Sequence, residues 1–445
     1  MKKIKFYIGA ILVLLTNFAF CQWGELGGTN ALSANSIIEC LCYDNFGNIY
    51  AAGDFTNSNG NRYVAKWDGT SWSELGGLDA LAANEHILSI CTDALGNVYA
   101  AGYFTNANGK KYVAKWDGII WSELEGTNSL DANSAITSIV SDTLGNIYTA
   151  GNFTNANGEY YVAKWNGITW SELDESYTFT GPIYCLFSEA SGNIYAGGPF
   201  FNASYNSYVA FWNGASWDEL GGVNSLPDCF VIQDIKLASD GKIYTSGAFF
   251  DGSIVSHIMK WDGSSWSELN GTNSLAANDG IGPIWSDAMG NVYASGNFTN
   301  ASGKRYVAMW DGISWNELGG TNALAANEEI LAICGDVTGK IYVAGRFTNA
   351  SNKYYVATYI NTVGFDKKDF EKLIYSPNPV TNILAISNST KIAKITILNI
   401  LGQPVLEKTV NDFRTQVDMS GLVKGTYILT VSTKKDVKQV KVMKQ

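Results

Sequence analysis

Residues 96–124 read GNVYAAGYFTNANGKKYVAKWDGIIWSEL, and close copies of this stretch recur along the chain. Its Trp116 belongs to a series of six tryptophans that Tyr359 continues, and successive members stand 49, 49, 47, 49, 49 and 49 residues apart. A second series, which heads each W-x-E-L segment, runs from Trp23 to Trp315 with intervals of 49, 49, 49, 47, 49 and 49 residues. The two series contain 13 of the 14 tryptophans, so the chain consists of seven copies of one unit.

One unit predicts four antiparallel strands. The expected strands of one copy are Ile87–Cys91, Asn97–Phe104, Lys111–Trp116 and Ile119–Leu124. Loop residues at 93–96 and 105–109 separate the first three strands. Asp117-Gly118 predicts a two-residue hairpin turn that pairs Trp116 with Ile119 and places Trp121 diagonally across from Trp116 on one face.

The ends of the repeat region predict a closed ring. The chain enters at Trp23–Leu26 as a fourth strand without the other three, and it leaves at Tyr355–Ile360 as a third strand without a fourth. Pairing these two segments completes a seventh unit and covers two strand edges that would otherwise invite aggregation. An open array is the alternative, but it needs dedicated polar end units, and the sequence contains none.

Every copy also has an isoleucine nine residues before the glycine of its G-[NK]-[IV]-Y motif. These are Ile38, Ile87, Ile136, Ile183, Ile232, Ile281 and Ile330. Such regularity indicates that every unit buries the same face against an equivalent neighbour.

The segment from Gly145 to Trp170, GNIYTAGNFTNANGEYYVAKWNGITW, resembles the bacterial secreted β-propeller repeats related to kelch and other seven-bladed families. The expected fold is therefore all-β, with a seven-bladed β-propeller of four-stranded blades over residues 22–362 and closure by the N-terminal strand. Propellers include binders, scaffolds and enzymes, so this resemblance predicts a fold and no particular activity.

Residues 1–21 have a basic start, an apolar run from about Phe6 to Phe20, and small residues near Cys21, which is typical of a secretory signal peptide cut after Cys21. A membrane anchor is the alternative, but the run is shorter than the roughly 20 residues that a span needs, and Asn17 interrupts it. No later segment is apolar enough to span a membrane, so the mature chain is expected to have no transmembrane segment.

The C-terminal part differs from the repeats. Residues 363–374 predict a polar linker, and residues 375–445 predict a small Ig-like β-sandwich with short alternating strands. Three short motifs appear there in order, P-N-P-V, N-x-x-G-x-x-V and L-x-x-G-x-Y. Their main residues are Pro377, Asn378, Pro379, Gly402, Leu422, Gly425 and Tyr427.

This run of motifs is similar to the C-terminal sorting domain, type A, of the type IX secretion system. The resemblance implies a Bacteroidetes-type bacterium, export across the outer membrane by the type IX machinery, and a secreted, extracellular or outer-surface protein. An ordinary Ig-like adhesive domain with coincidental motifs is the alternative.

Charge is divided unevenly along the chain. Residues 1–21 carry +3, residues 363–445 carry +6 (13 bases, 7 acids), and residues 22–362 carry −20 (14 bases, 34 acids). The acidic body argues against nucleic acid as a partner. A monomer is expected.

Few residues point to catalysis or to a bound metal, and no cofactor is predicted. Only His86 and His257 are present, at non-equivalent positions, so neither a Ser-His-Asp triad nor a His-rich metal centre is expected. Six cysteines remain after Cys21, and Cys42, Cys91 and Cys334 share one slot of the repeat, which is typical of a small apolar core position. Repeated carboxylates, such as those of D-G and W-x-E-L, are attributed to folding.

Candidate ligand-binding residues lie where the repeat changes. The W-x-E-L tryptophan precedes the next isoleucine by 15 residues in six copies but by 13 from Trp170 to Ile183, and the second-to-third strand loops of the fourth and fifth units also differ. The candidates are Asp174, Glu175, Tyr177, Phe179, Tyr205, Phe250 and Asp251. Exposed aromatic rings beside polar side chains would stack on and hydrogen-bond a sugar or a peptide. Drift in a decaying repeat is the alternative.

The expected function is that of a secreted or cell-surface binding or adhesion module without catalysis, with a glycan or a surface protein as ligand. Two alternatives remain open: a polysaccharide hydrolase or lyase that uses the loops of the fourth and fifth blades, and a structural spacer of the cell envelope.

Overall fold

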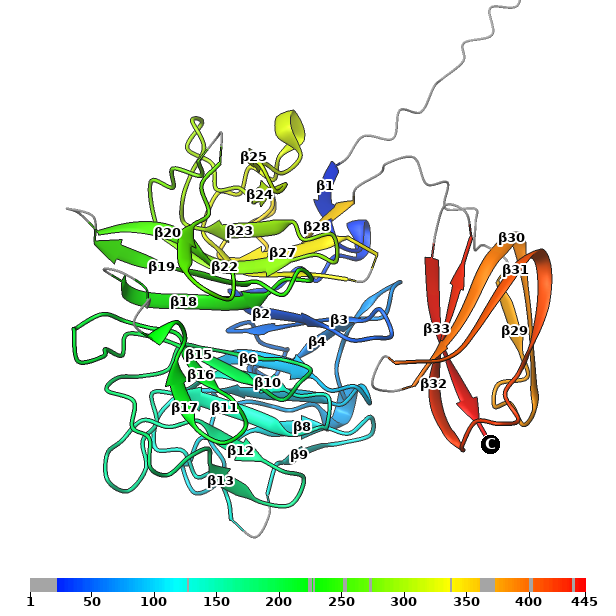
Figure 1. Ribbon diagram of the computed structural model, residues 1–445, viewed down its shortest axis with the longest axis horizontal. Helices are drawn as coiled ribbons and strands as arrows, with labels where there is room; N and C mark the ends of the chain where they lie inside the picture. The colour runs from blue at the N-terminus through cyan, green and yellow to red at the C-terminus, as the bar shows by residue number, and fades with distance from the viewer. Residues whose placement is uncertain are drawn as a thin grey trace, which may run out of the picture.

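A computed structural model describes residues 22–445 apart from 126–127, 223–225, 227–228, 251–253, 272–273, 337, 361–372, 400–402 and 434–436. The expected signal peptide and most of the expected linker lie outside these residues. Seven four-stranded antiparallel sheets form the ring, and a separate five-stranded sheet follows it (Figure 1). Each sheet is a blade, and the blades are numbered 1 to 7 from the one that begins with β2.

The innermost strands line the axis of the ring, and each is followed by a second strand. The innermost strands are β2 (Ile38–Tyr43), β6 (Ile87–Thr92), β10 (Ile136–Ser141), β14 (Cys185–Ser188), β18 (Cys229–Leu237), β22 (Ile281–Ser286) and β26 (Ile330–Gly335). The second strands are β3 (Ile49–Gly53), β7 (Val98–Gly102), β11 (Ile147–Gly151), β15 (Ile194–Gly197), β19 (Ile243–Phe250), β23 (Val292–Gly296) and β27 (Ile341–Gly345).

The third and fourth strands are short in most blades. The third strands are β4 (Ala65–Trp67), β8 (Ala114–Trp116), β12 (Ala163–Trp165), β16 (Ala210–Trp212), β20 (Ile254–Trp261), β24 (Ala308–Trp310) and β28 (Ala357–Ile360). The fourth strands are β5 (Trp72–Glu74), β9 (Trp121–Glu123), β13 (Trp170–Glu172), β17 (Trp217–Glu219), β21 (Trp266–Glu268), β25 (Trp315–Glu317) and β1 (Gln22–Glu25). Among the described residues, one-turn 3-10 helices follow β1, β5 and β25, at η1 (Gly28–Asn30), η2 (Gly77–Asp79) and η4 (Gly320–Asn322).

Ring closure occurs as the sequence predicts. Strand β1 pairs antiparallel with β28, with Trp23 opposite Tyr359, and the two rings lie 5.3 Å apart between centroids. The first strand of the described chain therefore supplies the outermost strand of blade 7, whose other strands come from the end of the repeat region.

The predicted two-residue turn between the third and fourth strands is wrong. Trp116 pairs directly with Trp121, so four residues form the connection and the indoles face each other at 5.9 Å between centroids. The reason is that the Asp117 carboxylate accepts hydrogen bonds from the backbone N–H groups of Ile119 and Ile120, which fixes a longer loop.

Hydrogen bonds from tryptophan link each blade to the one before it. In every blade, the indole Nε1 of the fourth-strand tryptophan donates to the carbonyl oxygen of the leucine that ends W-x-E-L in the preceding blade, at 2.8 to 3.2 Å. The donor and acceptor pairs are Trp72 and Leu26, Trp121 and Leu75, Trp170 and Leu124, Trp217 and Leu173, Trp266 and Leu220, Trp315 and Leu269, and Trp23 and Leu318. The last pair completes the circle.

The repeated isoleucine forms the buried inner layer that the sequence predicts, since each of the seven is at most 2% exposed. Beside this isoleucine, the end of the second strand passes close to the backbone at the start of the innermost strand. A Cβ on Gly102 would lie 2.2 Å from the carbonyl oxygen of His86, so only glycine fits beside the start of the innermost strand.

The C-terminal sheet contains β29 (Ile374–Ser376), β30 (Ile383–Leu398), β31 (Pro404–Asp418), β32 (Gly425–Ser432) and β33 (Val437–Lys444). Its strands form one hydrogen-bonded sheet that curls around its own apolar core, which includes Leu384, Ile395 and Val431. Asn378 fastens the P-N-P-V segment to β33, because its amide donates to the carbonyl of Lys441 and accepts from the N–H of Met443.

The described residues include most, but not all, of the other tail motifs. The Tyr427 hydroxyl donates to the carbonyl of Val423 at 2.9 Å, and Leu422 and Gly425 lie at the turn before β32 and at its start. Pro377 and Pro379 flank Asn378, and Gly402 lies outside the described residues.

We predict that Trp23→Phe destabilises the ring by about 1–3 kcal/mol, because it removes the indole hydrogen bond that completes the circle while keeping most of the apolar ring. Urea unfolding followed by tyrosine and tryptophan fluorescence measures the change. Trp285→Phe is the control, since Trp285 lies outside both repeated series. Equal midpoints for the two variants would show that the closing hydrogen bond contributes nothing.

Candidate functional site

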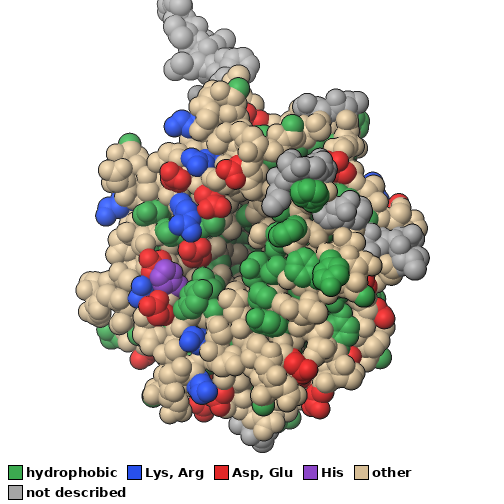
Figure 2. Space-filling view, turned by 90° about the vertical axis from the view of Figure 1, so that its left-hand side faces the viewer, with side chains coloured by type: hydrophobic (Ala, Val, Ile, Leu, Met, Phe, Trp, Pro, Cys, Tyr) green, Lys and Arg blue, Asp and Glu red, His purple; other side chains and the backbone are tan. Residues whose placement is uncertain are grey.

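Two classes of loop lie on the same face of the ring, as the sequence predicts. B–C loops join the second and third strands of a blade, and D–A loops join its fourth strand to the next blade. Lys111 of one B–C loop pairs with both Thr105 of that loop and Ala132 of the following D–A loop. Figure 2 shows this face, which is turned away from the C-terminal sheet and is hollowed at its centre.

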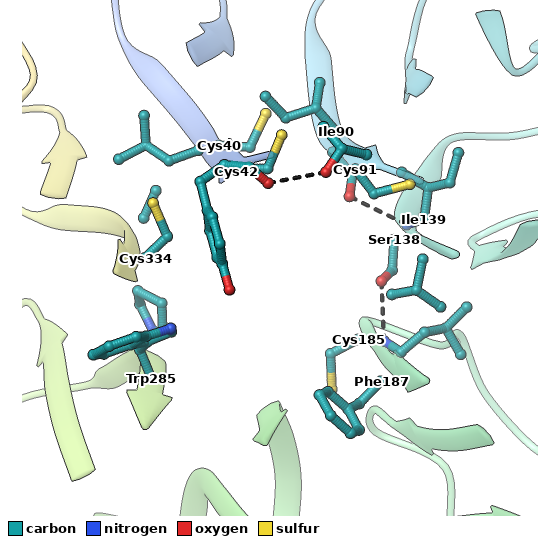
Figure 3. Close-up of a pocket in the computed structure, with 18 of the residues that line it drawn as sticks. Cys40, Cys42, Ile90, Cys91, Ser138, Ile139, Cys185, Phe187, Trp285 and Cys334 are labelled. Carbon is teal, nitrogen blue, oxygen red and sulfur yellow. Dashed lines mark hydrogen bonds between the residues drawn. The ribbon is translucent and has the colours of Figure 1, made fainter. Parts of the chain in front are cut away.

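The hollow opens into a channel of about 980 Å³ along the axis of the ring. The innermost strands of all seven blades supply its wall (Figure 3). Leu398 and Ile428 of the C-terminal sheet line the same cavity, and Lys441 Nζ lies 5.2 Å from the centroid of the Phe46 ring. The loop-bearing face therefore holds the open mouth of the channel.

Hydrogen bonds between neighbouring innermost strands hold the channel wall in place. The Ser89 hydroxyl accepts from the N–H of Ile139, and the Ser138 hydroxyl accepts from the N–H of Leu186, at 3.1 and 2.9 Å (Figure 3). In blade 5, a carboxylate oxygen of Asp234 takes the same role with the next blade at 3.0 Å. These side chains are therefore engaged in hydrogen bonds that hold neighbouring blades together.

The cysteines that share a repeat slot lie on strands that line this channel, and they pack against the apolar cores of the blades. Cys42, Cys91 and Cys334 lie on three neighbouring innermost strands (Figure 3), and all six cysteines of the described chain are free thiols. Burial raises the pKa of Cys91 and Cys334 far above the ordinary thiol value. The thiols therefore stay protonated and unreactive near neutral pH and behave as small wall residues.

The prediction that Phe179 is exposed is wrong. Its ring is 4% exposed and packs against Phe200 and Trp217, with centroids 5.0 and 5.3 Å away. Phe179 bridges to Tyr160 where five other copies have an alanine and one has Cys229, so the D–A loop that is two residues shorter is filled by a larger side chain. Tyr177 is half-buried beside it, and its hydroxyl lies 2.6 Å from that of Tyr208.

Asp174 and Glu175 lie in the turn just before these rings. The Asp174 carboxylate accepts hydrogen bonds from the backbone N–H and the hydroxyl of Ser176, and the hydroxyl bond lowers its pKa most. Its backbone is left-handed, with φ of 71°, so Asp174 stabilises its own turn. Glu175 is exposed.

The remaining candidates project from blades 4 and 5. Tyr205 is 87% exposed and Phe250 is 54% exposed, while Asp251 lies outside the described residues. Tyr184 and Phe230, at the inner ends of the same two blades, are also exposed, at 38% and 52%. Tyr184 lines the channel, and the ring of Phe230, on the innermost strand β18, lies 6.3 Å from that of Phe201 between centroids. We call Tyr184, Phe201 and Phe230 the aromatic side of the mouth; Figure 2 shows apolar side chains gathered on one side of the hollow.

Charged side chains from blades 7, 1 and 2 form the opposite side, which sequence reasoning missed. His86 Nε2 lies 3.0 Å from Asp54 Oδ1, and both Nε and Nη2 of Arg62 donate to the same oxygen. Arg346 Nε lies 3.2 Å from a carboxylate oxygen of Glu329. We call Glu39, Asp54, Arg62, His86, Glu329 and Arg346 the charged side of the mouth.

Two carboxyl groups on the charged side have pKa values that are shifted in opposite directions. Burial raises the pKa of Glu39, although the positive charge of Arg346 works against this. Burial also acts to raise the pKa of Asp54, but hydrogen bonds from Arg62 and Ser36 outweigh it and the pKa is lowered. One rim thus holds a carboxyl that keeps its proton more readily beside one that loses it more readily.

The repeat contained a signal for this charged side. The residue before the repeated isoleucine is apolar or glycine in five blades, but it is His86 in blade 2 and Glu329 in blade 7. The residue before the repeated phenylalanine is likewise Asp54 in blade 1 and Arg346 in blade 7. Comparing equivalent positions across blades, instead of loop lengths alone, would have found the group.

We predict that Asp54→Asn lowers the free energy of unfolding by about 1–3 kcal/mol at pH 7, because Arg62 and His86 lose an ionised partner. A carboxyl whose folded-state pKa is depressed stabilises the fold fully above its unfolded value of about 3.9, and this contribution disappears as the pH falls through the lower folded value. The difference from the parent protein should therefore shrink below about pH 4. Urea unfolding at several pH values measures this difference in the free energy of unfolding, and Glu175→Gln is the control at an exposed carboxylate. A difference between parent and Asp54→Asn that stays constant down to pH 2 would contradict the lowered pKa of Asp54.

Comparison with known proteins gives two results of different specificity. Residues 374–445 match the family model described as the secretion system C-terminal sorting domain. No curated protein is significantly similar to the chain in sequence.

Several solved structures are similar in fold. The WD40 β-propeller domain of Doa1 has a TM-score of 0.51 and 11% identity, over 77% of this chain and 98% of that one. A chain of the mitotic checkpoint complex has a TM-score of 0.50 and 12% identity, over 80% of this chain and 98% of that one. Identities this low support the fold alone.

PorZ of Porphyromonas gingivalis, described as an essential bacterial surface component of the type-IX secretion system, is similar over 91% of this chain, with 13% identity and a TM-score of 0.47. This chain spans 59% of the length of the PorZ chain. Among the described residues, no helix is long and apolar enough to cross a membrane. Residues 22–360 thus form a seven-bladed β-propeller, and residues 374–445 are a type IX secretion sorting domain that indicates export to the cell surface or the extracellular space.

Proposed function

We propose that the propeller is a binding or adhesion module without catalytic activity, and that the open mouth of its channel recognises a glycan or a surface protein. One observation carries this proposal: the rim of the mouth differs from blade to blade while the scaffold beneath it repeats. Within the seven blades, the isoleucine layer and the indole hydrogen bonds are the same throughout.

The chemistry of the rim suits an extended polar ligand. Its aromatic side offers flat apolar surface, and its charged side offers hydrogen-bond donors and acceptors about the same hollow. Ligand sites of this kind combine apolar and aromatic walls with a few placed polar groups. A glycan fits both sides, because each sugar ring presents C–H faces and hydroxyl edges.

The type IX sorting domain supports this proposal by placing the chain outside the cell, where glycans and surface proteins are available. The basic tail, with +6 over residues 363–445, and the acidic ring, with −20 over residues 22–362, are separate in composition. We therefore assign recognition to the ring and export to the tail.

We predict that the mature full-length chain binds polysaccharides or surface proteins prepared from its host bacterium, and that Phe230→Ala and Tyr184→Ala each weaken binding at least about tenfold, which corresponds to about 1.4 kcal/mol. Isothermal titration calorimetry measures the affinities. Leu144→Ala is the matched control, since Leu144 is 79% exposed in a turn on the other face of the ring.

Two results would contradict this proposal. Absence of binding to all polysaccharides and surface proteins tested would remove the binding role. Release of new reducing ends from a polysaccharide, lost in Glu39→Gln, would instead establish an enzyme whose acid is the carboxyl with the raised pKa.

We also predict that deleting residues 375–445 leaves the protein in the periplasm, because the sorting domain is what the type IX machinery recognises. Immunoblots of periplasmic, surface and medium fractions measure the distribution. Asn378→Ala is a milder companion variant, which loses the two hydrogen bonds to β33. Normal appearance of the truncated chain outside the cell would refute this role of the tail.

A further inference from the structure

Blade 5 breaks the repeat at one aromatic position, which is half-buried in most blades. The residue four places before the third-strand aromatic residue is tyrosine in six blades, and its ring packs against the repeated phenylalanine with centroids 4.9 to 5.0 Å apart. In blade 5 this residue is His257, whose ring lies 5.7 Å from that of Phe249. The substitution replaces a phenol by a smaller, more polar imidazole.

His257 also replaces a hydrogen bond that the other six blades share. There, an asparagine amide of the B–C loop donates to the W-x-E-L glutamate. The pairs are Asn57 and Glu74, Asn106 and Glu123, Asn155 and Glu172, Asn202 and Glu219, Asn300 and Glu317, and Asn349 and Glu25. In blade 5, β19 and β20 extend into a longer hairpin without that asparagine, and His257 Nδ1 lies 2.7 Å from Glu268 Oε1.

The arrangement leaves one ring nitrogen available. Glu268 Oε2 accepts from the amide of Asn270 at 2.6 Å, so both oxygens of the carboxylate are engaged. His257 Nδ1 is therefore the nitrogen that carries the shared proton, and Nε2 has no partner among the described residues. His257 is 25% exposed and Glu268 is 38% exposed at their side chains, so solvent reaches the pair.

A cavity of about 390 Å³ adjoins this pair. Strand β20, the end of β21 and the loop at 274–277 line it, with Leu275, Ala277 and Trp315 as apolar wall and Ser256 and Ser274 as further polar groups. Its size falls at the lower end of the range of about 300 to 1,000 Å³ that is typical of small-ligand pockets, so it suits a single ring and not a chain.

The charge of the pocket narrows the class of ligand. The negative charge of Glu268 disfavours an anion, and the hydrogen bonds that it accepts from His257 and Asn270 occupy part of its capacity to hold a cation. A neutral molecule with hydroxyl groups meets both the apolar wall and Nε2, which has no partner among the described residues. We infer that His257 and Glu268 form a pocket for one neutral pyranose, the terminal unit of a glycan, an inference that rests on the proposed glycan-binding function.

The test uses the mature full-length chain and names its probes: glucose, galactose, mannose and N-acetylglucosamine, with glucuronic acid as the charged comparison. Saturation-transfer NMR and calorimetry measure binding of each. The key variant is His257→Tyr, which restores the residue of the other six blades and should fold normally while filling the cavity. We expect at least one neutral sugar to bind the parent protein and to bind His257→Tyr at least tenfold more weakly.

Further variants separate the pocket from the mouth of the channel. Tyr306→His places the same imidazole in blade 6, where the Asn300 and Glu317 pair is intact, and should create no new sugar binding. Phe230→Ala tests the mouth, where it should weaken polysaccharide binding. Leu144→Ala, on the other face of the ring, is the control that should leave monosaccharide binding unchanged.

Three results would overturn the inference. These are unchanged neutral-sugar binding in His257→Tyr, a preference for glucuronic acid, and polysaccharide binding by the parent protein without binding of any neutral monosaccharide in the panel. The last result leaves the proposed binding at the mouth intact. If the parent protein binds neither polysaccharides nor monosaccharides, both the proposed glycan binding at the mouth and the pyranose pocket are contradicted.

Discussion

The ring depends on one hydrogen bond repeated seven times, from a tryptophan indole to the leucine carbonyl of the blade before it. Each contributes only about 0.5–1.5 kcal/mol, but each fixes the outer edge of one blade relative to the next. Because donor and acceptor both belong to W-x-E-L, the bond requires neighbouring blades to place this segment equivalently. The bond from Trp23 to Leu318 forms only when β1 has joined blade 7, so it couples closure of the circle to the first strand of the described chain.

Local hydrogen bonds explain most of the other sequence features that recur from blade to blade. In blade 1, the Asp44 carboxylate accepts from two backbone N–H groups, from the Asn48 amide and from the Tyr50 hydroxyl. Burial, with the nearby Asp44 charge, raises the pKa of Tyr50, so its hydroxyl remains a donor. The D-x-x-G-N-I-Y motif is therefore a satisfied turn, and its carboxylate has little capacity left for calcium.

The sequence predicts what recurs and misses what depends on three-dimensional neighbours. Strand number, the buried isoleucine layer and the pairing of the strand that bears Trp23 with the strand that bears Tyr359 all follow from periodicity. The pairing of Trp116 with Trp121 was missed because two-residue and four-residue connections share the Asp-Gly signal. Phe179 was misplaced because a shortened loop can expose or bury its ring, and only packing against Phe200 and Trp217 decides which.

The distribution of polar groups over the two faces supports the proposed function. On the face with the short turns, carboxylates such as Asp93 and Asp142 are saturated by hydrogen bonds within their own turns, which leaves little for a ligand. On the loop-bearing face, Glu39 has a raised pKa and no hydrogen-bond partner among the described residues. A group that the fold does not need is one that binding can use, so we place the proposed recognition site on the face that carries Glu39.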